Sequence, residues 1–345
     1  MKAVTVRPGS VESLRLDDLP EPSLEPDDLL IETLVVGVCG TDHEVLDGAI
    51  GHPPSGLDRL VLGHEALGRV IEAPDGSGLS KGDLVAPIVR RPDPVPCPNC
   101  AVGEWDMCRN GRSTEAGIRG LHGYARERFA LPAGFAVKVD PGLGLLGVLV
   151  EPASVVAKAW EHIVHIGSRA RWEPSRVLVT GAGPIGLLAA LFATRHSDEV
   201  HVLDQVTEGP KPDLVRDLGA TYHTEGLDEI EEGVDVVVEC TGDAELAVSV
   251  MGHTARNGIV CLTGVSGPGP QLVARSLARG LVLENDTVFG TVNANRRHYE
   301  EGARVLTGTD RSWLQRLVNR RVPLDRWIEA YDREPNDVKT VIGFG

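Results

Sequence analysis

Residues 176–195 constrain the fold of this chain more than any other segment, and they read RVLVTGAGPIGLLAALFATR. An apolar run leads into a turn containing Gly181, Gly183 and Gly186, and an Ala/Leu-rich helical pattern follows directly. The spacing G-x-G-x-x-G is weak evidence by itself, because glycines cluster in many turns. A strand before it and a helix after it are what a dinucleotide pyrophosphate requires, so the context favours a nucleotide site.

Each glycine of this turn has a physical reason to lack a side chain. Gly181 permits the tight turn, Gly183 lets the backbone approach a phosphate, and Gly186 lets helix and strand pack closely. The helix that begins near Pro184 and Ile185 offers free N–H groups and a partial positive charge to an anion. We therefore expect these five residues to bind the pyrophosphate of a dinucleotide.

The chain has two regions with different sequence patterns. Val-rich segments at 199–204, 234–242 and 258–265 alternate with helical patterns, which indicates a parallel sheet covered on both faces. The first 150 residues instead carry short β-like runs separated by turns rich in Gly, Pro and Asp, which predicts an irregular, mostly β domain. These runs are Leu29–Val38, Leu60–Val70 and Asp83–Val89, and a helix is expected at 295–308 in the tail.

Asp204 ends the second Val-rich strand, where an acid typically accepts a hydrogen bond from the adenosine ribose. A carboxylate at this point repels a 2′-phosphate, and no arginine follows it closely. The sequence therefore favours NAD over NADP. A solvated strand end is the alternative explanation of Asp204.

The charge balance excludes some classes of partner. The net charge is −16 and the isoelectric point is near 5.1, which disfavours nucleic acid and anionic membranes because both need clustered basic charge. No long apolar run suggests a membrane span, and the first residues lack the apolar core of a signal peptide. We expect a cytoplasmic protein whose six cysteines are metal ligands or core thiols rather than disulfides.

Four residues supply the donor types of a catalytic zinc site, which keeps few protein ligands and an open position. Cys39, His64, Glu65 and Glu151 come from three separate segments beside loops. Each has a plainer explanation, as a core thiol, a capping or core histidine, or a helix start. Spacing alone leaves the choice open.

The segment after Cys39 also carries a helix-capping signal. Thr41 and Glu44 form T-x-x-E, which predicts a capping box for a helix beginning near Asp42. Such a helix start does not exclude a metal site beside it.

Several motifs, taken in order along the chain, resemble the zinc-dependent medium-chain dehydrogenase/reductase family from end to end. They are GVCGTDHEVLDG (37–48), GHEALGRV (63–70), a cysteine-bearing lobe, VLVTGAGPIG (177–186) and ECTG (239–242). A narrower set resembles the glucose (aldose) dehydrogenase branch. Its members are the histidine directly after aspartate in CGTDHE, EAGIRGLHGY (115–124), EPASVVAKA (151–159) and GTVNANRRH (290–298).

The resemblance implies an α/β chain with two domains. A GroES-like, mostly β catalytic domain is expected at 1–152 and 292–345, with a lobe at about 90–112, and a Rossmann domain with a doubly wound parallel sheet at 153–291. The implied activity moves a hydride from C1 of an aldose to NAD or NADP with the help of zinc, giving an aldonolactone. A homodimer or homotetramer is implied. A polyol, secondary-alcohol or amino-alcohol dehydrogenase is the alternative, and a non-catalytic NAD-binding protein is a more distant one.

The resemblance also assigns roles to individual residues. Catalytic zinc ligands are expected at Cys39, His64, Glu65 and Glu151, and Thr41 and His43 are expected to begin a proton relay. Sugar contacts are expected from Thr41, Glu115, Glu151, Asn293 and His298, and further cofactor contacts from Thr241, Gly264, Val265, Val292 and Asn293. Some relatives carry a further sugar-binding acid four residues after the Glu151 position, where this chain has Val155, so the identity of the sugar stays open.

The lobe departs from the family pattern. A structural zinc in the family uses four cysteines spaced C-x2-C-x2-C-x7-C, whereas this chain has Cys97, Cys100 and Cys108, with Pro94 at the first position. A structural zinc site is normally closed and four-coordinate. Asp93 is the expected fourth donor; otherwise the lobe has lost its zinc and is held by packing.

Overall fold

The computed structural model describes residues 1–265 and 275–345. It contains two compact units, one made of Met1–Ser154 and Asn293–Gly345 and the other of Val155–Val292. The units meet after residues 154 and 292, whereas the sequence predicts domain boundaries after residues 152 and 291.

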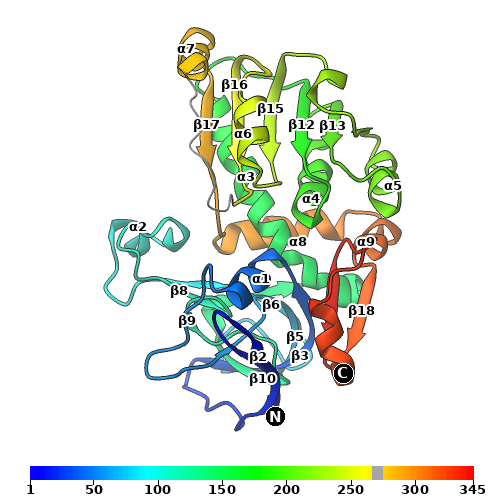
Figure 1. Cartoon of the computed structure of the whole chain (residues 1–345). Coiled ribbons are helices and arrows are strands. Elements are labelled where there is room, and N and C mark those ends of the chain that lie inside the picture. Colours follow the sequence, from blue (N-terminus) through cyan, green and yellow to red (C-terminus); the bar gives the residue numbers. More distant parts are fainter. Residues whose placement is uncertain (266–274) are drawn as a thin grey trace. The chain divides into compact units, whose positions relative to one another are not determined.

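The unit at 155–292 is built on a six-stranded parallel sheet in the order β14-β13-β12-β15-β16-β17 (Figure 1). The first strand along the chain lies inside the sheet, and the direction of winding reverses between β12 and β15. This is the doubly wound Rossmann order, so the predicted parallel sheet is confirmed. The strands are β12 (Arg176–Thr180), β13 (Glu199–Leu203), β14 (Thr221–His223), β15 (Val234–Glu239), β16 (Thr254–Leu262) and β17 (Thr287–Gly290).

Val-rich strands and short helices form the core of this unit. Val177, Val179, Val236 and Val238 are fully buried, as expected for strands covered on both faces. The helices are α4 (Pro184–Ala193), α5 (Pro210–Asp217), α6 (Ala244–Val250) and α7 (Arg275–Glu284), with a 3₁₀ turn η4 (Leu227–Glu229).

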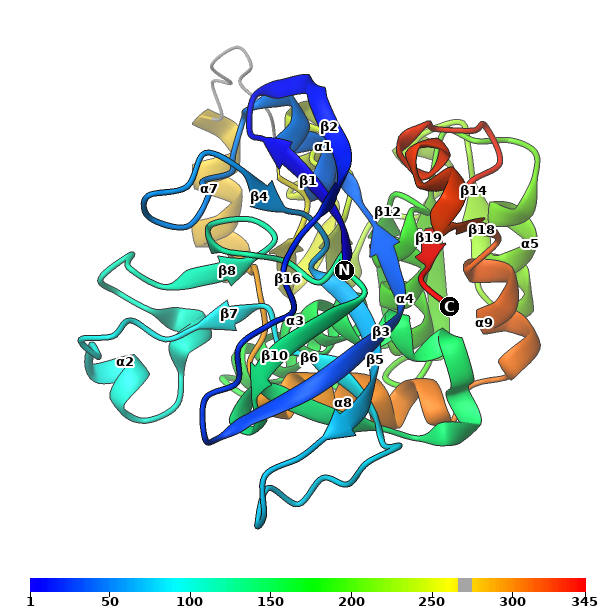
Figure 2. The same ribbon diagram turned by 90° about the horizontal axis from the view of Figure 1, so that it is seen from below.

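The other unit is mostly β, as predicted. Its largest sheet has seven strands in the order β11-β6-β5-β3-β19-β18, with β10 also paired to β3 (Figure 2). Smaller sheets have the orders β2-β1-β4 and β7-β8-β9. The strands are β1 (Lys2–Arg7), β2 (Ser10–Asp18), β3 (Asp28–Val38), β4 (Leu60–Val61), β5 (Glu65–Glu72), β6 (Leu84–Pro87), β7 (Arg90–Arg91), β8 (Thr114–Ala116), β9 (Gly120–Leu121), β10 (Arg128–Pro132), β11 (Ala136–Val139), β18 (Arg320–Pro323) and β19 (Thr340–Gly343).

One expected strand of this unit is interrupted. The run Leu60–Val70 was predicted as continuous, but it divides into β4 and β5 because Gly63 adopts φ +85°. Tyr124 donates its backbone N–H to the Gly63 carbonyl at 2.8 Å, so this break is fixed by a neighbouring loop.

Helices of this unit are short. They are α1 (Gly40–Asp47), α2 (Pro98–Ala101), the start of α3 (Val150–Gly167), α8 (Arg296–Thr307), α9 (Arg311–Leu317) and the 3₁₀ turns η1 (Trp105–Met107), η2 (Ala133–Phe135), η3 (Pro141–Leu149) and η5 (Leu324–Tyr331). The predicted tail helix corresponds to α8. The segment around α2 extends to the side of β7 and β8 (Figure 2).

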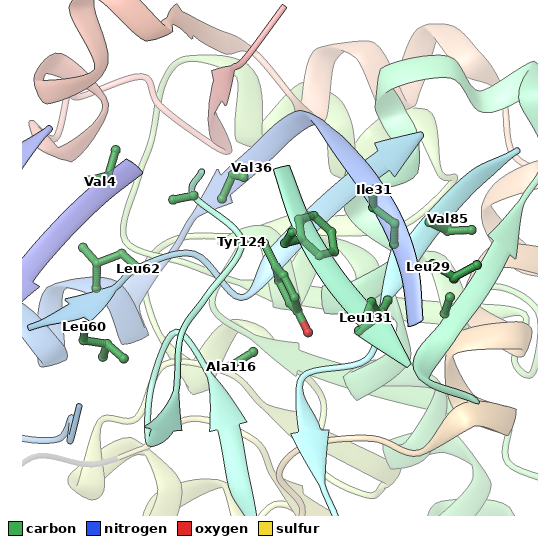
Figure 3. Packing of buried hydrophobic residues seen from close by; sticks show 14 of the residues in the cluster. Val4, Leu29, Ile31, Val36, Leu60, Leu62, Val85, Ala116, Tyr124 and Leu131 are labelled. Carbon is green, nitrogen blue, oxygen red and sulfur yellow. The ribbon is translucent and has the colours of Figure 1, made fainter. Parts of the chain in front are cut away.

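The core of the β unit joins strands to the loop at 115–124. Ile31 and Val36 from β3 pack with Leu62, Ala116 and Tyr124 (Figure 3). The ring of Tyr124 also lies 4.7 Å from that of Phe129, centroid to centroid. Both ends of the 115–124 loop are therefore anchored in the core.

One apolar segment has the length of a membrane span, contrary to the expectation from the sequence. It covers Pro141–Gly167, but 72 % of its most apolar window is buried inside the protein. Such burial is usual for the core helix of a globular protein.

Candidate metal centre and dinucleotide site

The N-terminus of α1 positions the first candidate ligand. Cys39 is the N-cap residue in an extended conformation, and its N–H donates to the Asp42 carboxylate at 2.9 Å. The helix thus begins at Gly40, and the capping box predicted for Thr41 and Glu44 is wrong. Asp42 lies at the third helical position and takes the role of reciprocal acceptor itself, so the cap moves two residues upstream.

The interrupted strand positions the second candidate ligand. Because Gly63 turns the chain, His64 points its Nε2 at the Cys39 sulfur, 2.9 Å away. His64 Nδ1 lies 3.5 Å from Asp42 Oδ1, and both side chains are almost fully buried. A carboxylate behind an imidazole holds the ring in orientation and makes the other nitrogen a better metal ligand.

Charges in this cluster reinforce one another. Burial alone would lower the pKa of His64, but the nearby Cys39 and Asp42 outweigh it and raise the pKa of His64 well above its usual value. Burial would raise the pKa of Asp42, yet His64 and the Cys39 N–H bring the pKa of Asp42 below its usual value. The site therefore favours positive charge at the point that the donors face.

Two carboxylates complete the acidic surroundings. Donor atoms of Cys39, His64 and Glu65 all lie within 4.8 Å of one another. Glu151, the second residue of α3, is outside that group but interacts electrostatically with it. Burial, reinforced by Glu65, raises the pKa of Glu151 to about 7, against the opposing effect of His64.

A buried lysine was missed by the sequence analysis. Lys339, which precedes β19, is 1 % exposed, forms an ion pair with Glu65 and donates to the Val38 carbonyl at 3.0 Å. It thus binds the residue before Cys39 and the residue after His64. A Cβ at Gly37 would collide with the Glu65 carboxylate and approach the Lys339 side chain, so the strand leaves room for this pair.

The donor set fits a zinc ion. A thiol, an imidazole and a carboxylate converge from separate loops, and the imidazole is oriented by an acid. These three donors would leave one position of a four-coordinate zinc ion for a further ligand.

The two residues expected in a proton relay lie in the first turn of α1. Thr41 is partly buried. His43 contacts the edge of Tyr331, with 6.5 Å between ring centroids. Burial lowers the pKa of His43, and the Arg333 charge lowers it further.

The predicted sugar contacts form two groups. Glu115 and Asn293 meet, since Asn293 Nδ2 donates to Glu115 Oε1 at 2.5 Å. Asn293 has φ +62°, which a non-glycine residue seldom adopts. His298 is buried in the first turn of α8, where its Nδ1 accepts the Asn295 N–H at 3.0 Å.

Four arginines near these residues are engaged within the protein. Arg90 binds Glu115, with 2.8 Å between Nη2 and Oε1. Arg91 lies over the Phe135 ring, with 4.2 Å from its guanidinium carbon to the centroid. Arg296 donates to the carbonyls of Gly134 and Ala136, and Arg297 pairs with Glu104.

The lobe gathers its three thiols without the predicted fourth donor. Sulfur atoms of Cys97, Cys100 and Cys108 lie within 4.8 Å of one another. Asp93 faces elsewhere, because its carboxylate accepts the Val95 N–H and the Asn110 amide, both at 2.8 Å. Hydrogen bonds from the backbone N–H groups of Arg109 and Cys100 lower the pKa of Cys97 to about 6.

The glycine turn has the geometry that the sequence predicts. Gly181 adopts φ +86°, and a Cβ at Gly186 would collide with the Gly181 carbonyl. Asp204 Oδ2 accepts the Ala182 N–H at 2.6 Å, and Lys211 Nζ lies 3.4 Å from the same oxygen. Lys211 was not anticipated from the sequence, which separates it from Asp204 by six residues.

The other expected cofactor residues follow β15, β16 and β17. Glu239, fully buried at the end of β15, accepts the Thr241 N–H at 2.6 Å, and its carbonyl accepts the Gly264 N–H at 3.1 Å. Val265 and Val292 are 71 % and 57 % exposed. Two of the loops at this sheet edge are therefore joined through Glu239, at the point where nucleotides bind in doubly wound sheets.

Comparisons with known proteins agree with this geometry. Residues 25–141 match the alcohol dehydrogenase GroES-like domain, and residues 144–344 match the family model described as glucose dehydrogenase C-terminus. Glucose 1-dehydrogenase of Methanocella arvoryzae is 39 % identical over 361 aligned positions, covering 100 % of both chains. Glucose 1-dehydrogenase of Thermoproteus tenax is 40 % identical over 349, covering 99 % of each.

A solved structure is similar over the same extent. Glucose dehydrogenase from Haloferax mediterranei, determined in complex with NADP, Zn and gluconolactone, has a TM-score of 0.93 and 34 % identity. The alignment covers 100 % of this chain and 99 % of that one.

Proposed function

This chain belongs to the zinc-dependent medium-chain dehydrogenase/reductase family, in its glucose dehydrogenase branch, and on that premise we propose its reaction. It is a zinc- and NAD(P)-dependent aldose 1-dehydrogenase. The sugar loses a hydride from C1 and a proton from the C1 hydroxyl, and the products are an aldonolactone and the reduced cofactor.

The observation that carries this proposal is the convergence of unlike donors in one unit. Cys39, His64 and Glu65 supply a thiol, an imidazole and a carboxylate within 4.8 Å. Glu115 and Asn293, which the family resemblance assigns to sugar binding, meet at 2.5 Å. A site built from such polar groups discriminates strongly between a hydroxyl and its absence.

Zinc and the dinucleotide supply the chemistry that side chains lack. When bound, zinc acts as a Lewis acid that lowers the pKa of a hydroxyl, and the nicotinamide accepts the hydride. Cys39, His64, Glu65 and Glu151 would hold the metal. Gly181–Gly186 and Asp204 would hold the cofactor, whose pyrophosphate suits the start of α4.

The remaining roles belong to the protein side chains. Thr41 contacts the reacting hydroxyl and relays the proton of that hydroxyl toward solvent by way of His43. Glu115, Glu151, Asn293 and His298 orient the sugar through its hydroxyl groups. Val292, Val265, Gly264 and Thr241 line the cofactor.

A substrate panel tests the reaction. Glucose, galactose, xylose, sorbitol, inositol and threonine are offered to the purified enzyme with NAD⁺ or NADP⁺, and cofactor reduction is followed by absorbance. We expect turnover of aldoses with an aldonolactone as product. Turnover confined to sorbitol, inositol or threonine would replace the proposal with a polyol or amino-alcohol dehydrogenase.

NAD is proposed as the preferred cofactor, with NADP also accepted. The Asp204 carboxylate repels a 2′-phosphate, whereas Lys211 at 3.4 Å offsets part of that charge. Ratios of kcat/KM for the two cofactors measure this preference directly.

A second zinc is proposed in the lobe, held by Cys97, Cys100 and Cys108. Their sulfurs are close enough to share an ion, and the Asp93 carboxylate would have to leave Val95 and Asn110 to become the fourth ligand. Zinc analysis of wild type and Cys97→Ser tests it. Two ions per chain are expected in the wild type and one in the variant; an equal content in both would contradict the second site.

We also propose a cytoplasmic homodimer or homotetramer without nucleic-acid or membrane partners. All six cysteines are free thiols, which suits a reducing compartment. Sedimentation analysis measures the assembly state.

A further inference from the structure

Glu115 uses its two carboxylate oxygens very differently. Oε1 accepts from Arg90 Nε at 3.1 Å, from Arg90 Nη2 at 2.8 Å and from Asn293 Nδ2 at 2.5 Å. A carboxylate oxygen has two lone pairs, so these three donors leave no room for another. Oε1 is therefore committed to the protein.

The other oxygen remains available. Within residues 1–265 and 275–345, no group donates a hydrogen bond to Glu115 Oε2. Arg119 Nε lies 3.5 Å from this oxygen, beyond a normal hydrogen bond. Glu115 is nevertheless only 8 % exposed, so its charge is held in a mostly buried place by Arg90.

Hydrogen bonds to two different residues fix the guanidinium of Arg90 in place. It lies on β7 directly opposite Glu115 on β8, and its Nη1 donates to the Asp106 carbonyl at 2.7 Å. Its side chain is 13 % exposed. A guanidinium with three of its N–H groups bound in this way cannot swing out without breaking all of them.

The turn that carries Glu115 packs on the loop of a candidate zinc ligand. Gly117 has φ +75°, and a Cβ there would lie 2.8 Å from the carbonyl oxygen of Gly63, which precedes His64. Reciprocal backbone bonds of 2.7 and 2.8 Å between Glu115 and Arg119 close the turn. Ala116 and Tyr124 hold it in the core (Figure 3). The position of Glu115 relative to the Gly63–His64 segment is therefore fixed.

We propose that Arg90 is a positioning residue that determines sugar specificity by presenting Glu115 Oε2, as an acceptor, to one ring hydroxyl of the substrate. The inference rests on the proposed aldose reaction. The favoured substrate class is an aldose with that hydroxyl intact, because a deoxy sugar leaves the ionised oxygen unpaired. Arg90 contributes no contact to the sugar and acts only through the carboxylate.

Lysine cannot replace arginine in this role. A single ammonium provides charge but lacks the planar fork that fixes the orientation of a carboxylate. In Arg90→Lys, Glu115 can rotate, and its two oxygens become interchangeable. Arg90→Gln removes the charge as well.

The test compares glucose with its 2-deoxy and 3-deoxy analogues in wild type, Arg90→Lys and Arg90→Gln. Arg91→Lys is the matched control, since Arg91 is the next residue of β7 and binds Tyr124 and Phe135 rather than Glu115. We expect KM for glucose to rise roughly ten- to a hundredfold in the Arg90 variants, the size of one hydrogen bond to a charged group. KM for one deoxy analogue should stay nearly constant, so discrimination between it and glucose collapses. Cofactor affinity, zinc content and the Arg91→Lys control should remain as in wild type.

A second comparison keeps the test decisive if Arg90→Gln folds poorly because it leaves Glu115 unpaired. The double variant Arg90→Gln/Glu115→Gln carries neither charge of the pair, and Glu115→Gln alone is the variant with which its discrimination is compared. If Arg90 acts through Glu115, the double variant discriminates no worse than Glu115→Gln alone. Wild-type discrimination in Arg90→Lys, or a further loss in the double variant, would overturn the inference. A wild type that oxidises no aldose would instead refute the proposed function itself.

Discussion

Replacing Lys339 by methionine tests how the candidate metal centre is held together. Lys339 is 1 % exposed and pairs with Glu65, which is 3 % exposed, so the substitution leaves a carboxylate buried without its cation. Removing one partner of a buried ion pair costs about 3–5 kcal/mol, because the remaining charge cannot return to water. Lys339 also donates to the Val38 carbonyl, so the strand before Cys39 loses a hydrogen bond.

The expected loss can be measured by urea denaturation of the metal-free enzyme, in which no zinc ion neutralises Glu65. We predict a fall of about 3 kcal/mol in the free energy of unfolding for Lys339→Met, equivalent to roughly 6–12 °C in Tm for a domain of this size. The double variant Lys339→Met/Glu65→Gln should regain most of the loss, since it removes the uncompensated charge.

A matched control separates this effect from the loss of any lysine. Lys138 forms a 2.8 Å pair with Asp83, but its side chain is 56 % exposed. Exposed pairs contribute about 0–1 kcal/mol, so Lys138→Met should leave stability nearly unchanged. A Lys339→Met variant as stable as Lys138→Met, or no recovery on adding Glu65→Gln, would show that the buried ion pair does not stabilise the protein.

Three further substitutions test the metal ligand Cys39, the cofactor residue Asp204 and the packing of Gly117. Cys39→Ala should lower kcat/KM by orders of magnitude while cofactor affinity, followed by fluorescence titration, stays within about twofold; normal turnover would reject Cys39 as a ligand. Asp204→Asn should shift the ratio of kcat/KM toward NADP⁺ by roughly tenfold, the effect of removing one like charge, and an unchanged ratio would place Asp204 outside the ribose site. Gly117→Ala should destabilise the protein by more than about 2 kcal/mol, because strain from φ +75° adds to the collision with Gly63. Gly111→Ala is the control, since Gly111 has φ +68° but open space around it, and it should cost only about 1 kcal/mol. Equal shifts in Tm for the two variants would contradict the close packing of Gly117.

Much of the fold can be predicted from local sequence patterns, such as apolar strands and glycine turns. The sequence predicts β12, the glycine turn and α4, because each glycine of the turn stands where a side chain would not fit. In the structure Gly181 has a positive φ, and a Cβ at Gly186 would collide with the Gly181 carbonyl. Cys39 and His64 were recognisable as a pair only through the family resemblance. Their spacing alone could not exclude a core thiol and a core histidine.

The features that were missed depend on contacts between distant segments. Lys339 reaches Glu65 across 274 positions of the chain because β3 pairs with both β5 and β19. The N-cap at Cys39 was mispredicted because T-x-x-E satisfies the local rule equally well, and only the Asp42 side chain decides between the two. The contact between Arg90 and Glu115 follows only from the pairing of β7 with β8, which no local sequence pattern indicates.

In the proposed reaction the enzyme removes a hydride from C1 of an aldose. Glucose carrying deuterium at C1 tests it directly, with the reduced cofactor and the sugar product analysed by mass spectrometry. We expect the label to appear in the reduced nicotinamide and the product to be an unlabelled aldonolactone. Turnover that leaves deuterium in the sugar product would contradict it.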